Sequence, residues 1–186
     1  MTQAAKVHDD TRPFHYEGDK SLKVSDVFSR MYASPDYIRQ TGEHEDVKIS
    51  FTQNILNRLA QDNKSFKAEQ YRGKPLMYCE FAHAMENSLG NLREHVDAWY
   101  DYREWCGGFI WDYVDQSLRL EEEGRIKWLY GGDFDEEVSH KYYNANGIVA
   151  GDRSLHPSAY EVKKCYQYVR VKGQELEKGL GSIENR

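Results

Sequence analysis

The stretch Lys74-Pro-Leu-Met-Tyr-Cys-Glu-Phe81 is a short and mostly apolar run, which predicts a buried strand. A helical stretch over about residues 88–104 follows it, and then a second apolar run, Gly107-Gly-Phe-Ile-Trp-Asp-Tyr-Val114. In the helical stretch apolar residues recur at spacings of three and four, and Asn87 and Ser88 offer an N-cap. The order strand, helix, strand predicts an α/β fold with a βαβ unit, whose two strands run parallel.

Three further runs have strand character. They are Arg12–Tyr16, the shorter Ile126–Tyr130, and Tyr166–Lys172, which alternates like a half-buried strand. Residues 39–72 break this pattern because they are rich in charge and amide groups, with one modest helical window over 47–60. We expect this segment to be a surface insertion that carries a helix.

The amino-acid composition of the chain excludes some classes of binding partner. The 186 residues hold 25 Lys and Arg against 31 Asp and Glu, a net charge of −6. A chain this acidic is a poor candidate for a nucleic-acid or anionic-membrane binder. No apolar run approaches the roughly 20 residues of a membrane helix. The three cysteines, Cys79, Cys106 and Cys165, have no metal-ligand spacing, so we expect reduced thiols and a cytoplasmic protein.

Polar side chains stand where the predicted strands end, which is where parallel α/β folds place functional groups. Glu80 lies at the end of one strand, Trp111 and Asp112 near the end of the next, and Tyr16 at the end of the first. A carboxylate after an apolar strand is costly to bury unless it is paired or functional. Glu80 is therefore either a functional group or a strand-end residue that reaches solvent or an arginine.

The candidate residues near Glu80 also fit either a functional or a structural role. His83 follows Glu80 by three positions, and a binding donor is favoured over a metal ligand because no second His or Cys accompanies it at ligand spacing. Trp111 and Tyr16 fit packing roles as well as binding roles. The 25 aromatic residues suit sugar rings, and retaining glycoside hydrolysis needs two carboxyl groups about 5–5.5 Å apart, but composition alone does not choose that chemistry.

The segment Leu76-Met-Tyr-Cys-Glu-Phe-Ala-His-Ala-Met-Glu-Asn-Ser88 resembles the nucleophile segment of the β-galactosidases of glycoside hydrolase family 2. Further blocks that resemble the same family, in the same order, are residues 12–18, 107–117, 130–134 and 146–153, with His156-Pro157. The resemblance covers about residues 8–172. It implies the C-terminal portion of a (β/α)₈ TIM barrel in residues 1–160, with 161–186 as the start of the following β-sandwich domain or a tail.

The resemblance also implies roles at the sugar-binding site. Glu80 would be the nucleophile that forms a covalent galactosyl intermediate, and Tyr16 would lie beside it and assist its departure. His83 would bind a galactose hydroxyl, and Trp111 would line the galactose pocket.

The resemblance also implies two bound metal ions. Asn146 and the backbone carbonyl of Tyr143 would hold a sodium ion that contacts the sugar, since amide and carbonyl oxygens suit a hard cation. Magnesium is expected in the parent enzyme, with ligands outside this chain. In one departure from the family, Glu86 stands where glycine is usual, so we expect a strained or reshaped loop after Glu80.

The implied activity is hydrolysis, with retention, of terminal non-reducing β-D-galactose residues in lactose-type substrates. The family's acid/base glutamate is expected N-terminal to this chain, since no Asn-Glu motif precedes Tyr16. We therefore expect a segment that works with the remainder of the enzyme or a complementary subunit, within an oligomer. The alternatives are a non-catalytic subunit, an inactive remnant, and a sugar-binding module.

Overall fold

The computed structural model describes residues 2–19, 21–48 and 65–186. It divides into two compact units. The first unit comprises Met1–His83 and Asp97–Trp111, and the second comprises Ala84–Val96 and Asp112–Arg186. The domain boundaries expected from the sequence, 1–160 and 161–186, stay a prediction.

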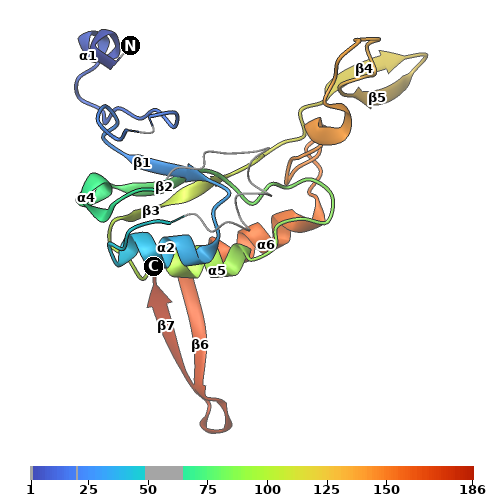
Figure 1. Cartoon of the computed structure of the whole chain (residues 1–186). Coiled ribbons are helices and arrows are strands. Elements are labelled where there is room, and N and C mark those ends of the chain that lie inside the picture. Colours follow the sequence, from blue (N-terminus) through green and yellow to red (C-terminus); the bar gives the residue numbers. More distant parts are fainter. Residues whose placement is uncertain (1, 20, 49–64) are drawn as a thin grey trace. The chain divides into compact units, whose positions relative to one another are not determined.

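A three-stranded parallel sheet organises the first unit. Its strands are β1 (Phe28–Met31), β2 (Leu76–Phe81) and β3 (Trp105–Ile110), with β2 in the middle. Figure 1 shows the three side by side. Helix α5 (Leu92–Trp99) lies between β2 and β3 in the sequence. The predicted strand–helix–strand order with parallel strands is thus confirmed, although α5 is shorter than the predicted 88–104 and β3 begins and ends earlier than predicted.

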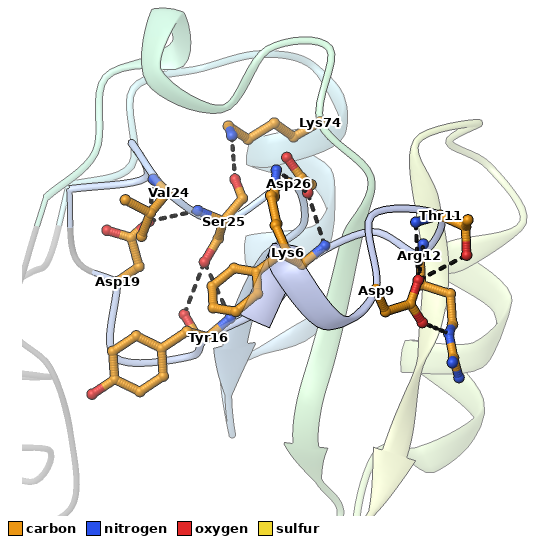
Figure 2. A network of polar contacts seen from close by, with 11 residues as sticks. Lys6, Asp9, Thr11, Arg12, Tyr16, Asp19, Val24, Ser25, Asp26 and Lys74 are labelled. Carbon is orange, nitrogen blue, oxygen red and sulfur yellow. Dashed lines mark hydrogen bonds and ion pairs between the residues drawn. The ribbon is translucent and has the colours of Figure 1, made fainter. Parts of the chain in front are cut away.

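The predicted strand at Arg12–Tyr16 is wrong, and β1 pairs with β2 instead. The backbone N–H of Phe14 donates to Asp26 Oδ2 at 2.8 Å, and that of Tyr16 donates to Ser25 Oγ at 3.1 Å (Figure 2). These N–H groups bond to side chains and not to a neighbouring strand. Local side-chain acceptors of this kind compete with sheet formation.

Aromatic rings form the core of the first unit. The Tyr78 ring centroid lies 4.9 Å from that of Trp105, and Phe81 lies 5.0 Å from Trp99. Helices α2 (Pro35–Gly42) and α4 (Ala68–Tyr71) contribute buried residues, whereas α1 (Thr2–His8) contributes none. Such ring pairs contribute stabilisation beyond the area they bury.

The described ends of the predicted surface insertion, 39–72, belong to this core. Val47, Phe66 and Tyr71 are buried, and Val47 and Phe66 form an antiparallel bridge. The Phe66 ring centroid lies 5.0 Å from that of Phe28 in β1. The surface expectation is therefore wrong for these residues, while most of the predicted helical window 47–60 lies outside the described residues.

The second unit contains two hairpins and short helices. The hairpins are β4 (Leu118–Glu122) with β5 (Arg125–Leu129), and β6 (Val169–Glu175) with β7 (Leu180–Asn185). The helices are α6 (Pro157–Cys165) and the 3₁₀ turns η1 (Lys141–Asn144) and η2 (Leu176–Lys178). The strand predicted at 126–130 is confirmed as β5, and the one predicted at 166–172 begins later, at Val169. In the described part of the chain, no helix is long and apolar enough to span a bilayer.

Candidate functional site

The carboxyl ends of β1, β2 and β3 meet at one edge of the parallel sheet. Backbone bonds join the three ends: Tyr32 N–H donates to the Glu80 carbonyl at 2.9 Å, and Trp111 N–H donates to the Phe81 carbonyl at 3.0 Å. Tyr32 follows β1 directly, Glu80 lies in β2, and Trp111 follows β3 directly. This edge is where α/β folds place their ligands.

The Glu80 side chain is held by a tyrosine at this edge. The Tyr32 hydroxyl donates to Glu80 Oε2 at 3.0 Å. The Tyr32 ring centroid also lies 6.0 Å from that of His83. Ala82, between Glu80 and His83, has a positive φ of 50°, so the chain turns sharply after the strand. The structure thus brings together Glu80, His83 and Tyr32, with Trp111 on the neighbouring strand end.

The sequence reasoning placed Tyr16 beside Glu80, which stays a prediction, and it did not name Tyr32, whose hydroxyl is bonded to Glu80. The Tyr16 ring packs over Gly18, because a Cβ at Gly18 would lie 2.5 Å from the Tyr16 ring and hydroxyl. Figure 2 shows the Tyr16 backbone bonded to Ser25, with its ring directed away from that contact. Tyr16 is 54% exposed. The signal for Tyr32 was its place directly after Phe28–Met31, a run that the sequence reasoning did not identify as a strand.

The nearby thiol of Cys79 does not compete with Glu80 as a nucleophile. Burial has the largest effect and raises the pKa of Cys79, a hydrogen bond with Ser29 opposes it, and the negative charges of Glu17 and Glu80 raise this pKa further. Desolvation lowers the pKa of His15, whose Nε2 lies 2.6 Å from Ser29 Oγ. A thiol that keeps its proton is a poor nucleophile. Glu80 therefore stays the carboxylate that the resemblance predicts as the nucleophile at this edge.

The second unit holds the other two predicted residues. Asn146 is only 3% exposed, and its Oδ1 is buried with no hydrogen-bond partner among the described residues. Tyr143 lies in η1, three residues earlier. A buried amide oxygen without a donor is costly, and a hard cation would satisfy it. The residues present therefore fit the expected sodium ion. Among the residues described, no group of three His, Cys, Asp or Glu could hold a metal ion.

Comparison with known proteins gives consistent matches. The family model "Glycosyl hydrolases family 2, TIM barrel domain" matches residues 1–171. A protein named beta-galactosidase from Psychromonas ingrahamii is 36% identical over 187 residues, covering 98% of this chain and 17% of the relative. Another beta-galactosidase, from Photobacterium profundum, is 38% identical over 170 residues, covering 90% of this chain and 15% of the relative. The chain thus spans less than a fifth of the length of these curated relatives.

Among solved structures, the chain is similar to a GH2 beta-galacturonidase from Eisenbergiella tayi bound to galacturonate. The TM-score is 0.47 and the identity 17%, and the match covers 89% of this chain and 29% of that one.

Proposed function

This chain belongs to glycosyl hydrolases family 2 and is a portion of the TIM barrel domain, and from that premise we propose that it supplies the nucleophile of a retaining β-galactosidase. The nucleophile is Glu80. The observation that carries the proposal is the 3.0 Å hydrogen bond from the Tyr32 hydroxyl to Glu80, at the strand edge where barrel enzymes place their chemistry. The beta-galactosidase names of the relatives support terminal β-D-galactose residues as the substrate class.

In the first step, a Glu80 oxygen forms a bond to the anomeric carbon as the glycosidic C–O bond breaks. The leaving oxygen takes a proton from an acid/base carboxyl that lies outside this chain. In the second step, water gives a proton to that base and attacks the anomeric carbon, and Glu80 leaves as a carboxylate. The Tyr32 hydroxyl orients Glu80 and stabilises its charge as it departs, the role expected from the sequence for Tyr16.

The remaining residues bind the sugar. His83 donates to a galactose hydroxyl, and Trp111 offers an aromatic face to the ring. Asn146 Oδ1 and the Tyr143 backbone carbonyl would hold sodium, which supplies a fixed positive charge to sugar oxygens when bound. The magnesium ligands of the assembled enzyme lie outside this chain.

The proposal places residues 1–160 at the C-terminal end of the barrel and 161–186 at the start of a β-sandwich. The chain then needs the remainder of the enzyme or a complementary chain to complete the barrel. The coverage of 15–17% of the relatives supports this requirement. Cytoplasmic location and assembly into oligomers are part of the same proposal.

The test is covalent trapping. The chain is assembled with the missing barrel part of a relative and treated with a 2-fluoro-galactoside, which slows breakdown of the glycosyl ester. Peptide mapping should find the label on Glu80, and Glu80→Gln should abolish both label and turnover. A label on any other acid would remove Glu80 from the nucleophile role.

The role of Tyr32 is tested in the same assembly. Tyr32→Phe should lower kcat by about 10- to 100-fold, since a hydrogen bond to a charged group contributes about 1.5–3 kcal/mol. Tyr16→Phe is the matched control and should stay within about twofold of the parent. The opposite ranking of the two variants would return the role to Tyr16.

A further inference from the structure

Two segments of the second unit, 112–115 and 146–149, run side by side through backbone bonds. Asp112 N–H donates to the Asn146 carbonyl at 2.7 Å, and Ile148 N–H donates to the Asp112 carbonyl at 3.0 Å. Val114 and Val149 form a parallel bridge. These bonds hold the residues on both sides of Gly147.

Gly147 itself is bonded by side chains. Its N–H donates to Asp115 Oδ1 at 2.8 Å, and its carbonyl accepts from His156 Nδ1 at 2.9 Å. Nδ1 therefore carries a proton. The two side chains also approach each other, with His156 Nε2 3.5 Å from Asp115 Oδ2. We call Asp115 and His156 the Gly147 clamp.

The clamp acts on Asn146 through the peptide that joins it to Gly147. This peptide is planar, and both of its polar groups are held: the Asn146 carbonyl by Asp112 N–H, and the Gly147 N–H by Asp115. Holding both groups fixes the orientation of this peptide plane, which contains the Asn146 Cα, and so restricts the directions that the Asn146 Cα–Cβ bond can take. Among the described residues no hydrogen bond holds the buried Asn146 Oδ1, so its direction depends on the backbone and on the packing around the side chain.

We propose that Asp115 and His156 are positioning residues that aim the amide oxygen of Asn146, the group that the proposed function assigns to a hard monovalent cation. Asp115 acts on the Gly147 N–H. His156 acts on the Gly147 carbonyl, in the peptide that follows, and so holds the other side of Gly147. Neither side chain touches the cation or the sugar.

The test measures the side-chain orientation of Asn146 by NMR in the 186-residue chain. The three-bond coupling between backbone N and Cγ of Asn146 should report one χ1 rotamer in the parent. In His156→Ala and Asp115→Ala it should become averaged, with exchange of the Gly147 amide hydrogen at least about tenfold faster, as the loss of one hydrogen bond implies.

Conservative variants distinguish a positioning effect on Asn146 from a general loss of stability. His156→Asn should restore the single rotamer, because the asparagine amide nitrogen takes the place of Nδ1, and Asp115→Asn should restore it because it keeps an oxygen for the Gly147 N–H. His8→Ala, on the exposed face of α1, is the matched histidine control and should leave the coupling unchanged.

A parent-like coupling in both alanine variants would overturn the proposal. If both alanine variants unfold, His156→Gln decides, because its amide nitrogen reaches the place of Nε2 and misses the Gly147 carbonyl. An averaged coupling in that variant supports positioning, and a single rotamer overturns it.

A sodium titration tests the cation of the proposed function separately from the positioning role of the Gly147 clamp. In the chain assembled with the missing barrel part of a relative, sodium chloride replaces choline chloride at constant ionic strength, and the Asn146 side-chain amide shift is followed. The parent should respond, and His156→Ala should need about tenfold more sodium, equivalent to one lost hydrogen bond. A parent that ignores sodium removes the cation from the proposed function, while the coupling result still decides on the clamp.

Discussion

Glu86 adopts a left-handed backbone conformation, with φ of 56°, in the loop that follows β2. The sequence reasoning expected strain at this position because the resembling family usually has glycine there, and the positive φ confirms that expectation. For an L-residue the left-handed conformation costs roughly 1–2 kcal/mol, because Cβ crowds the following carbonyl. Glycine has no Cβ and escapes this cost.

Glu86→Gly should therefore raise the free energy of unfolding by about 0.5–1 kcal/mol, after the larger backbone entropy of glycine in the unfolded chain is subtracted. Urea denaturation of the two chains measures the difference. Glu86→Ala is the control, since it removes the charge but keeps Cβ, and it should give no such gain. Equal gains for Gly and Ala would mean that charge, and not backbone strain, is relieved.

At the scale of elements, the loop over 16–26 depends on one carboxylate. Asp19 is buried and accepts from the backbone N–H groups of Val24 and Ser25, each at 2.9 Å (Figure 2). It also accepts from the Ser21 hydroxyl at 2.7 Å. Burial alone would raise the pKa of Asp19. The hydrogen bonds together outweigh burial and hold this pKa far below the ordinary 3.8. The ionised carboxylate thus stabilises the loop that leads into β1.

The low pKa predicts an acid-sensitive loop. Because the folded pKa lies below the unfolded value, the stabilisation is fully present above about pH 4 and is lost as the pH falls toward the folded pKa. Below pH 4, the free energy of unfolding should fall less steeply for Asp19→Asn than for the parent. At pH 7 this variant should be less stable by about 2 kcal/mol, because it replaces charged acceptors by weaker ones. Parallel acid profiles for the two chains would contradict the assignment.

The pairing of 112–115 with 146–149 leaves no room for a side chain at Gly147. A Cβ there would lie 2.2 Å from the Asp115 nitrogen and 2.6 Å from the Val149 carbonyl oxygen, both of them backbone atoms. Gly147→Ala should therefore reduce the free energy of unfolding of the second unit by about 1–3 kcal/mol. Thermal unfolding of the parent and the variant measures this loss of stability.

Gly90→Ala is the matched control for that substitution, because nothing lies within 4 Å of the new methyl group. Its stability should stay within about 0.5 kcal/mol of the parent. Equal effects of the two substitutions would show that the close backbone approach at Gly147 relaxes without cost.

At the scale of the whole molecule, burial is unevenly distributed. The aromatic core around β1–β3 buries Phe28, Tyr78 and Phe81, whereas the side chains of the β6–β7 hairpin are mostly exposed. Figure 1 shows this hairpin in red at the C-terminal end of the chain. A two-stranded hairpin by itself is only marginally stable in water.

Amide hydrogen exchange of the 186-residue chain should reflect this difference. The amides of β2 should exchange only through global opening, and those of β6 and β7 at least about 100-fold faster through local opening. Mass spectrometry of exchanged peptides measures both regions in one experiment. Protection of β6 equal to that of β2 would mean that a further surface covers the hairpin.

The reasons for the missed elements lie in contacts between distant residues. β1 contains Ser29 and Arg30 and shows little apolar pattern. The Arg30 guanidinium lies 5.7 Å from the ring centroids of both Tyr37 and Phe66, so aromatic faces accommodate its charge in the strand. Tyr37 and Phe66 come from distant segments, so no local pattern indicates this strand, nor the tyrosine that follows it.

The sequence by itself determined the family, the parallel β2–β3 pair and the position of Glu80 in β2, because apolar runs, helical periodicity and ordered motifs are local properties of the chain. Only the tertiary structure decided which strand borders β2, which tyrosine meets Glu80 and which side chains hold the Gly147 peptide. Those contacts join residues between 9 and 49 positions apart. Their formation depends on the free energy of the whole packed unit, which no short stretch of sequence contains.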